Sequence, residues 1–370
     1  MPRLLRLLTL AVLACLVAAA PASAGSRFTI RGAGFGHGVG MSQYGAYGYA
    51  KHGVGFAAIL SHYYTGTTLG AAPSNSVRVL LRPNAGSVGI TDATAACGAT
   101  LNEGAIYTAS RSGNSVVLRA PNGTSVGACG SALSATGGDA VKVIGKGVYH
   151  GAIDIRVASG AGVNAINTVD LESYVRGVVS RESPSSWPLE ALKAQAVAAR
   201  SFALTGKVGG NGFDLYDDTR SQVYGGIGAE TASTDKATAQ TAGQVVMYGG
   251  KVATCYFSST SGGYTENLEN SFVGSKPVPY LKGVPDPYDD VSPYHRWTVK
   301  LTAARMQSAL SRYLKGGKLK GIKVNRRGVS PRIVYATIIS TAGKTRVTGM
   351  TLKGALGLRD SWAFFKKSKG

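Results

Sequence analysis

Short runs of β-branched and apolar residues, separated by glycine-rich turns, recur along the chain and predict a structure rich in strands. The 370 residues include 51 glycines, and glycine is most useful in the tight turns between short strands. A hairpin is predicted around the Gly249-Gly250 pair, with strands at 244–248 and 251–257. Five further runs are expected to be strands of a β-rich region: 77–81, 87–91, 115–118, 140–144 and 152–157.

Helical spacing of apolar residues is clearest between 188 and 204, where Leu189, Leu192 and Ala196 recur with little polar interruption. This pattern predicts a helix that is buried on much of its surface. Pro188 suits its first turn, and Glu190 there favours electrostatic support of the helix over chemistry. Shorter helices are predicted at 55–64, 234–242 and 303–314.

The segment just before the long helix is β-branched and predicts a buried strand at 175–180. Pro184 and Pro188 bar a helix between them, so Glu182 is expected in a strand-to-helix loop. A carboxylate in such a loop could carry acid–base chemistry, or it could be solvated beside Arg181. Together these elements predict an α+β fold with a helical core and a β-rich subdomain inserted before it.

The first residues have the pattern of a secretory signal peptide. Arg3 and Arg6 precede an apolar run, and Ala22-Ser23-Ala24 forms a small-residue cleavage site, so residues 1–24 are expected to be removed. Lipid anchoring at Cys15 is the minor alternative. No later segment is apolar for long enough to predict a transmembrane span. We therefore expect a secreted or cell-wall protein that works outside the cytoplasm.

The net charge of +21 favours an acidic partner. Nucleic acid is disfavoured by the predicted export and by the lack of a nucleic-acid-binding motif. Anionic wall polymers or an anionic membrane surface fit better. The basic stretch at 315–332 is either a wall-binding face or a solvated loop.

Three cysteines remain once the leader is removed. An oxidising compartment makes a bridge between Cys97 and Cys129 plausible. Cys255 would then be unpaired, and its apolar strand-like surroundings favour a buried thiol over a nucleophile, which would need a nearby base.

Four blocks of sequence then carry a resemblance. They are YVRGVVSRESPSSWPLEALKAQAVAARSFAL at 174–204, GAGFGHGVGMSQYGAYGYAKHGVGFAAILSHYYTGT at 32–67, DDTRSQVYGG at 217–226 and CYFSSTSGGYTE at 255–266. This set resembles the SpoIID/LytB family of sporulation stage II protein D-like lytic transglycosylases and amidase enhancers. The resemblance covers nearly all of the mature chain, and it implies a mixed α+β fold with a glycan-binding cleft.

The order of the blocks differs from that of typical members, in which the GHGxGMSQ block closes the chain. Here it stands at the front, and the segment 28–30 continues the pattern of LKGALGLRDSWAFF at 352–365, the segment that the block follows in typical members. A circular permutation would leave this arrangement, so the two ends are expected to lie side by side. The expected divisions are a leader (1–24), the permuted block (25–70), a β-rich subdomain (76–160), a catalytic core (163–290) and a C-terminal α/β segment (291–370).

The resemblance implies cleavage of peptidoglycan glycan strands to 1,6-anhydro-muramyl products, with Glu182 as the single catalytic residue. A single carboxyl group suffices because an internal hydroxyl replaces the water that an ordinary glycosidase must activate. Asp217 and Asp218 are rival carboxylates that better suit a turn. The expected substrate-binding residues are His37, Ser42, Gln43, Arg200, Gln222, Tyr224, Ser261 and Gly262.

Structural roles stay open for two of these residues, since His37 could be a hydrogen-bonding residue and Arg200 could pair with an acidic neighbour. Family resemblance also implies a second role, a non-catalytic wall-binding protein that stimulates a wall amidase. Some relatives are expected to bind zinc near the Ser/Gly-rich segment, but residues 255–266 offer only Cys255 as an N or S ligand. A zinc site needs three or four such ligands, so neither metal nor cofactor is predicted.

Overall fold

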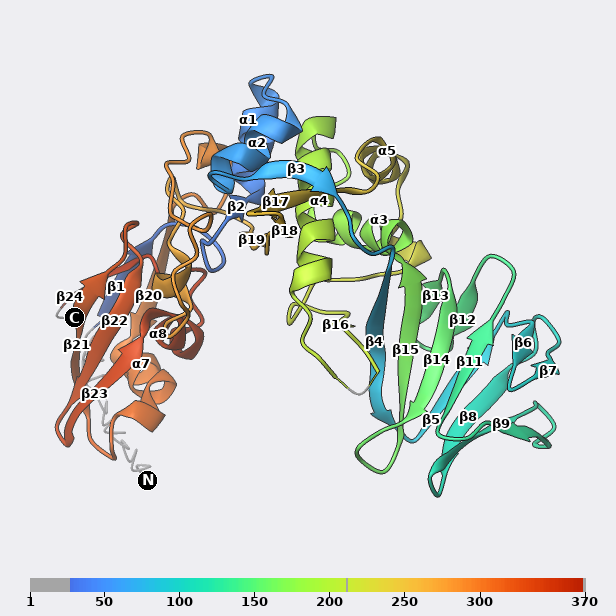
Figure 1. The fold of residues 1–370 in the computed structure, drawn as a ribbon. Helices are drawn as coiled ribbons and strands as arrows, with labels where there is room; N and C mark the ends of the chain where they lie inside the picture. The colour runs from blue at the N-terminus through green and yellow to red at the C-terminus, as the bar shows by residue number, and fades with distance from the viewer. Residues whose placement is uncertain (1–26, 211, 369–370) are drawn as a thin grey trace, which may run out of the picture.

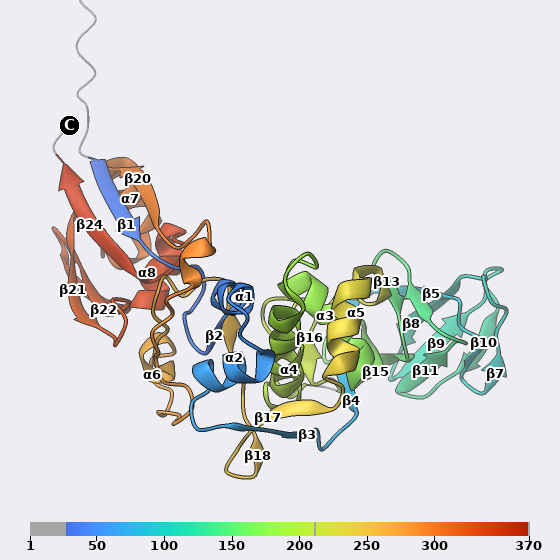
Figure 2. The ribbon, with the colours of Figure 1, turned by 90° about the horizontal axis from the view of Figure 1, so that it is seen from above.

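The computed structural model describes residues 27–210 and 212–368, so the predicted leader lies outside the described residues. Three parts follow one another along an elongated α+β molecule (Figures 1 and 2). They are a β lobe built mainly from residues 76–170, a helical middle built mainly from residues 41–71 and 171–291, and a terminal lobe formed by residues 27–32 and 297–368. Within the described ranges, no helix has the length and apolarity needed to cross a membrane.

Two antiparallel layers make up the β lobe, and their inner faces share one apolar core that includes Val79, Ile90 and Ile153. The larger sheet has the order β16-β4-β15-β14-β11-β6-β7, with β16 (Leu215–Tyr216) parallel to its neighbour. Its other strands are β4 (Ser76–Ala85), β15 (Val163–Asp170), β14 (Ala152–Val157), β11 (Ala132–Thr136), β6 (Ala95–Ala96) and β7 (Ala99–Thr100).

The second sheet of this lobe has the order β10-β9-β8-β5-β12-β13. Its strands are β10 (Ser125–Ala128), β9 (Ser115–Arg119), β8 (Tyr107–Ser112), β5 (Ser87–Thr91), β12 (Val141–Val143) and β13 (Gly147–Tyr149). All five strands predicted for this region are thereby confirmed. β15 extends the β-rich region beyond 160, because it pairs with both β4 and β14.

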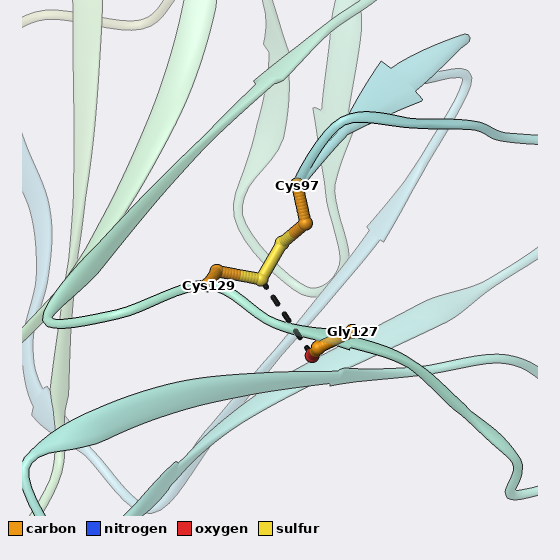
Figure 3. The surroundings of a disulfide bond; sticks show 3 residues. All are labelled: Cys97, Gly127 and Cys129. Atoms are coloured by element: carbon orange, nitrogen blue, oxygen red, sulfur yellow. Dashed lines mark hydrogen bonds between the residues drawn. A yellow bond between two sulfur atoms is a disulfide. The ribbon is translucent and has the colours of Figure 1, made fainter.

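A disulfide between Cys97 and Cys129 joins the turn after β6 to the end of β10 (Figure 3). The two Cα atoms are 5.2 Å apart, which lies within the ordinary range for a bridge. Cys129 Sγ lies 3.7 Å from the carbonyl oxygen of Gly127. Cys255 is free and buried.

The predicted strand at 175–180 is wrong, because these residues lie inside α3 (Leu171–Glu182). Asp170 caps this helix by accepting a hydrogen bond from the Ser173 N–H. Val175, Val178 and Val179 have helical spacing and are fully buried. Their packing outweighs the slight preference of β-branched residues for strands. Glu182 is therefore the last residue of a helix and does not lie in a strand-to-helix loop.

The predicted long helix is confirmed as α4 (Leu189–Thr205). The helical middle forms a second apolar core around it. Elements near α4 include the predicted helices α2 (Phe56–Tyr63) and α5 (Ala232–Gln240), and the hairpin of β17 (Gln244–Tyr248) and β18 (Lys251–Val252), which ends earlier than predicted. The remaining elements are α1 (Gln43–Lys51), α6 (Leu268–Ser271), β2 (Met41–Ser42), β3 (Thr68–Ala71), β19 (Phe257–Ser258) and the 3-10 turns η1 (Ile227–Ala229) and η2 (Asp289–Val291).

Both ends of the described chain meet in the terminal lobe. β1 (Arg27–Gly32) is the central strand between β20 (Trp297–Thr302) and β24 (Ala363–Ser368), and Ile30 lies opposite Phe365. This pairing confirms that the front of the chain lies beside its last strand, while the permuted block order itself stays a prediction. A second sheet, β21 (Leu319–Arg327), β22 (Ile333–Ser340) and β23 (Gly343–Thr348), shares the core of this lobe with α8 (Gly349–Leu356) and with α7 (Ala303–Ala309), which continues into the 3-10 turn η3 (Ser311–Tyr313).

Removing the disulfide by the paired change Cys97→Ser and Cys129→Ser is expected to destabilise the β lobe by about 3 to 4 kcal/mol, because the unfolded chain loses a closed loop. Chemical denaturation followed by circular dichroism measures this change. Reduced wild-type protein should match the variant. Equal unfolding midpoints for the oxidised wild type and the variant would show that the bridge adds no stability.

Candidate active-site cavity

A cavity of about 570 Å³ opens where the helical middle meets the terminal lobe. Glu182 is the sole carboxylate among its lining residues, and five aromatic side chains form much of its wall. The cavity therefore combines one acid with apolar surface, as in many ligand sites. Its lining residues are Phe35, Gly36, His37, Glu182, Phe202, Thr219, Arg220, Ser221, Tyr256, Phe257, Ser258, Ser259, Phe272 and Lys353.

Two hydrogen bonds hold Glu182 at the end of α3. Its Oε1 accepts from the Val223 N–H at 2.9 Å, and its backbone carbonyl accepts from Gln43 Nε2 at 2.8 Å. Gln43 therefore fixes the C-terminus of α3 while itself lying in α1. The side chain of Glu182 reaches the cavity from a rigid helix end, anchored to the loop that carries Val223.

Burial raises the pKa of Glu182 above its ordinary value, although the hydrogen bonds from Val223 and Gln43 act in the opposite direction. A raised pKa keeps a larger fraction of this carboxyl group protonated near neutral pH. Glu182 can thus donate a proton to a leaving group, as a general acid does, and the resulting carboxylate can then act as a base.

His37 lies in the same cavity as Glu182, although 145 positions separate the two residues in the sequence. Its Nδ1 accepts from the Val39 N–H at 3.0 Å, so the proton of the neutral ring is on Nε2. Burial, with help from Lys353 and Arg332, lowers the pKa of His37 to about 3. The ring is therefore neutral near pH 7, and hydrogen bonds with the backbone of Val39 and Phe257 hold it in the cavity wall.

Close backbone approach explains the glycine pattern around His37. Gly38 has a φ of +74°, and a Cβ atom there would lie 2.2 Å from Cζ of Arg332. Gly40 has a φ of +69°, and its Cβ would lie 2.1 Å from the Tyr256 carbonyl oxygen. Side chains at either position would both strain the backbone and displace the segments that form the cavity.

Two cations line the cavity that sequence reasoning did not select. Lys353 comes from α8 and donates to the Gly36 carbonyl at 2.9 Å. Arg220 pairs with Asp218 at 2.7 Å and lies over the Tyr216 ring. Lys353 could have been suspected, because it lies in the segment 352–365 that belongs to the family resemblance. The aromatic wall residues offered no comparable signal.

Three of the expected substrate-binding residues, Ser42, Ser261 and Gly262, gather instead around one buried carboxylate. Asp289 accepts from the Ser42 hydroxyl and from the backbone N–H groups of Ser261 and Gly262, each at 2.8 Å. This cluster holds the start of α1 against the Ser/Gly-rich segment beside the cavity. None of the three residues lines the cavity itself.

Arg200, Gln222 and Tyr224 are also buried away from the cavity surface. Arg200 forms two hydrogen bonds with Glu172, at 2.8 and 2.6 Å, which realises the acidic pairing left open by its sequence. The Tyr224 hydroxyl donates to Asn167, and Gln222 accepts from the Tyr174 hydroxyl. These contacts position α3 and its neighbours.

The rival carboxylates Asp217 and Asp218 form ion pairs with Lys146 and Arg220. Both lie in the turn that precedes Val223, and neither lines the cavity. Across the described part of the chain, no group of three or more His, Cys, Asp or Glu residues is placed to hold a metal ion.

The structure is an α+β fold with one carboxyl group of raised pKa in a cavity lined by aromatic residues. Such a site suits chemistry that needs a single acid. Residues 159–248, which include Glu182, match the family model described as Stage II sporulation protein. Stage II sporulation protein D of Bacillus subtilis (strain 168) is 36% identical over 207 residues, or 51% of this chain and 57% of that protein. Over this segment the chain is similar to the SpoIID/LytB family.

Two further relatives extend this comparison. The amidase enhancer of Bacillus subtilis (strain 168) is 41% identical over 134 residues, which cover 36% of this chain and 18% of that protein. An uncharacterised protein of Brachyspira hyodysenteriae (strain ATCC 49526 / WA1) is 32% identical over 231 residues, or 52% of this chain and 62% of that protein. In each case the chain spans less than two thirds of the relative's length.

Glu182→Gln is expected to stabilise the protein at neutral pH, because folding then no longer buries a carboxylate whose protonated form the folded state prefers. Gln keeps an acceptor oxygen for the Val223 N–H. The gain should disappear as the pH falls below the ordinary glutamate pKa of 4.5, where folded and unfolded states are both protonated. Denaturant unfolding from pH 3 to 8 measures it, and a gain that grew toward low pH would contradict the raised pKa.

Proposed function

We propose that the chain acts outside the cytoplasm on the bacterial cell wall, as a lytic transglycosylase that cleaves peptidoglycan glycan strands. The observation that carries this proposal is Glu182, the single carboxylate of the cavity, held at a helix end with a raised pKa. The family match across residues 159–248 supports a role at the cell wall.

The reaction needs one group that first donates a proton and then accepts one. Protonated Glu182 gives its proton to the glycosidic oxygen between N-acetylmuramic acid and N-acetylglucosamine, and the bond to the anomeric carbon breaks. The resulting carboxylate takes the proton of the muramyl 6-hydroxyl while that oxygen bonds to the anomeric carbon, which gives the 1,6-anhydro product. Hydrolysis by two carboxylates fits less well, because the cavity lining holds only one.

Other lining residues suit a sugar chain. Tyr256 and Phe272 lie with ring centroids 5.3 Å apart and offer apolar faces on which pyranose rings can pack. Arg220 and Lys353 give the cavity two cations that can pair with a carboxylate of the substrate.

A second function rests on the similarity to the protein named amidase enhancer. In that role the chain binds the wall and stimulates a separate amidase without cleaving glycan strands. The residues that shape the cavity would then serve binding only, and the carboxyl proton of Glu182 would have no use.

Glu182→Gln is expected to lower the yield of 1,6-anhydro-muramyl ends by at least 100-fold, since general acid–base catalysis contributes about that much or more. Purified protein is incubated with intact and with peptide-free glycan strands, and the products are identified by mass spectrometry. Glu103→Gln removes the same charge from an exposed loop of the β lobe and should leave the yield unchanged.

The outcomes separate the two functions. Products that persist with Glu182→Gln would reject Glu182 as the acid. If the wild type gives no anhydro ends on either substrate but increases the rate of an added wall amidase, the enhancer role replaces the enzymatic one.

A further inference from the structure

Most of the chain's net positive charge is concentrated near its C-terminal end. Residues 291–370 hold 18 of the 40 Lys and Arg residues, but only one of the 19 Asp and Glu residues. That one is Asp360, which is buried and paired with Arg332 at 2.9 Å. The other 290 residues hold 22 basic and 18 acidic residues. A mixture of positive and negative surface charge is enough for solubility, whereas charges of one sign repel one another. We therefore expect this almost entirely basic segment to bind a negatively charged partner.

One sheet of the terminal lobe gathers part of this charge on its outer face. Along β22, Val334, Ala336 and Ile338 are buried, which turns Tyr335, Thr337 and Ile339 to the opposite side. The strand register places four exposed cations beside these outward residues, two from each flanking strand. They form the cationic face: Lys323 and Arg326 of β21, and Lys344 and Arg346 of β23.

The register orders these charges in rows. Thr337 lies opposite Lys323 on one side and Arg346 on the other. Because neighbouring strands are about 4.8 Å apart, the two outer strands present their cations about 10 Å apart across the sheet. The face thus offers repeated positive charge over an open sheet surface, which suits an extended chain with repeated negative charge.

Tyr335 orients the two arginines of the cationic face. The guanidinium carbon of Arg346 lies 3.9 Å from the centre of its ring, and that of Arg326 lies 5.6 Å away. Stacking on an aromatic ring leaves the guanidinium N–H groups free for anionic oxygens. Within the described residues, no carboxylate forms a salt bridge with any of the four cations.

We infer that the cationic face binds a linear phosphodiester polymer of the cell wall. Arginine matches phosphate oxygens in a bidentate manner, and a polymer can contact both outer strands at once. A membrane surface fits less well, because an interfacial segment needs exposed apolar anchors beside its cations, and the outward residues of β22 are only partly exposed. The choice of a wall polymer over nucleic acid rests on the proposed function at the cell wall.

The same lobe reaches the cavity through Lys353, and Arg332 joins it to the Ser/Gly-rich segment by donating to the Ser261 carbonyl at 2.7 Å. Polymer bound at the cationic face would therefore hold the cavity at the wall without entering it.

The test measures binding of the full exported chain to fluorescent poly(glycerol phosphate) across a salt series, with dextran of matched length as the neutral probe. Changing Lys323, Arg326, Lys344 and Arg346 together to Gln is expected to lower the affinity at least tenfold. The slope of log affinity against log salt should fall in magnitude by roughly two to three, since fewer counterions are released. The control changes four exposed cations outside this lobe to Gln: Arg119, Lys236, Lys251 and Lys276. Its affinity should stay within twofold of the wild type.

Three results would overturn the inference: an equal loss in both quadruple variants, no binding of the wild type, or tighter binding to single-stranded DNA or to phosphatidylglycerol vesicles at matched phosphate. Circular dichroism checks that each variant is folded. Binding and glycan cleavage fail separately, because Glu182→Gln should bind the polymer normally while the cationic-face variant should still cleave short soluble strands.

Discussion

The cavity depends on one buried ion pair, between Arg332 and Asp360. Two parallel hydrogen bonds of 2.9 Å join them, and Arg332 also donates to the carbonyl oxygens of Tyr264 and Ser261 at 2.8 and 2.7 Å. A buried guanidinium is tolerated only when its donors are satisfied, because desolvation otherwise exceeds the attraction between the charges. Here the partners come from the end of the chain and from the Ser/Gly-rich segment, so the ion pair fixes both. Gly38 then packs directly against the guanidinium, which brings the loop of His37 to the same place.

Two further buried carboxylates also join separate segments of the chain by hydrogen bonds. Asp289 holds Ser42 and the backbone of Ser261 and Gly262. Glu266 accepts from the Ser330 hydroxyl and from the Val329 N–H, which ties the segment after the cavity to the terminal lobe. Loops at this junction carry backbone groups that no regular sheet satisfies, so side-chain acceptors must replace the missing ladder. The junction is therefore organised by polar contacts, while the β lobe is organised by apolar burial.

The acid and most of the net positive charge lie on different sides of the boundary between the helical middle and the terminal lobe. Glu182 lies where burial outweighs the hydrogen bonds that favour its ionised form, and the cations of the terminal lobe are mostly exposed around a core of their own. A large positive field next to an acid would favour its ionised form. The pKa of Glu182 is shifted by burial and by the hydrogen bonds of Val223 and Gln43, and no lysine or arginine contributes to the shift. Of the terminal-lobe cations in the described residues, Lys353 alone lines the cavity of Glu182.

The sequence by itself determined the elements whose signal is local. The apolar spacing at 188–204 specifies α4, the β-branched runs specify five strands of the β lobe, and Gly249-Gly250 marks the hairpin. Motif resemblance selected Glu182 and His37, and the structure places both in one cavity. The α+β class and the pairing of the first and last strands also followed from the sequence.

Only the tertiary structure decided the environment of each polar residue. Residues 175–180 are helical because the packing of three valines overrides their local preference. Arg200 is engaged by Glu172, and Lys353 reaches the cavity from the far end of the chain. Burial, pairing and pKa depend on atoms that meet across long stretches of sequence, and a local pattern of residues carries no information about which distant atoms those will be.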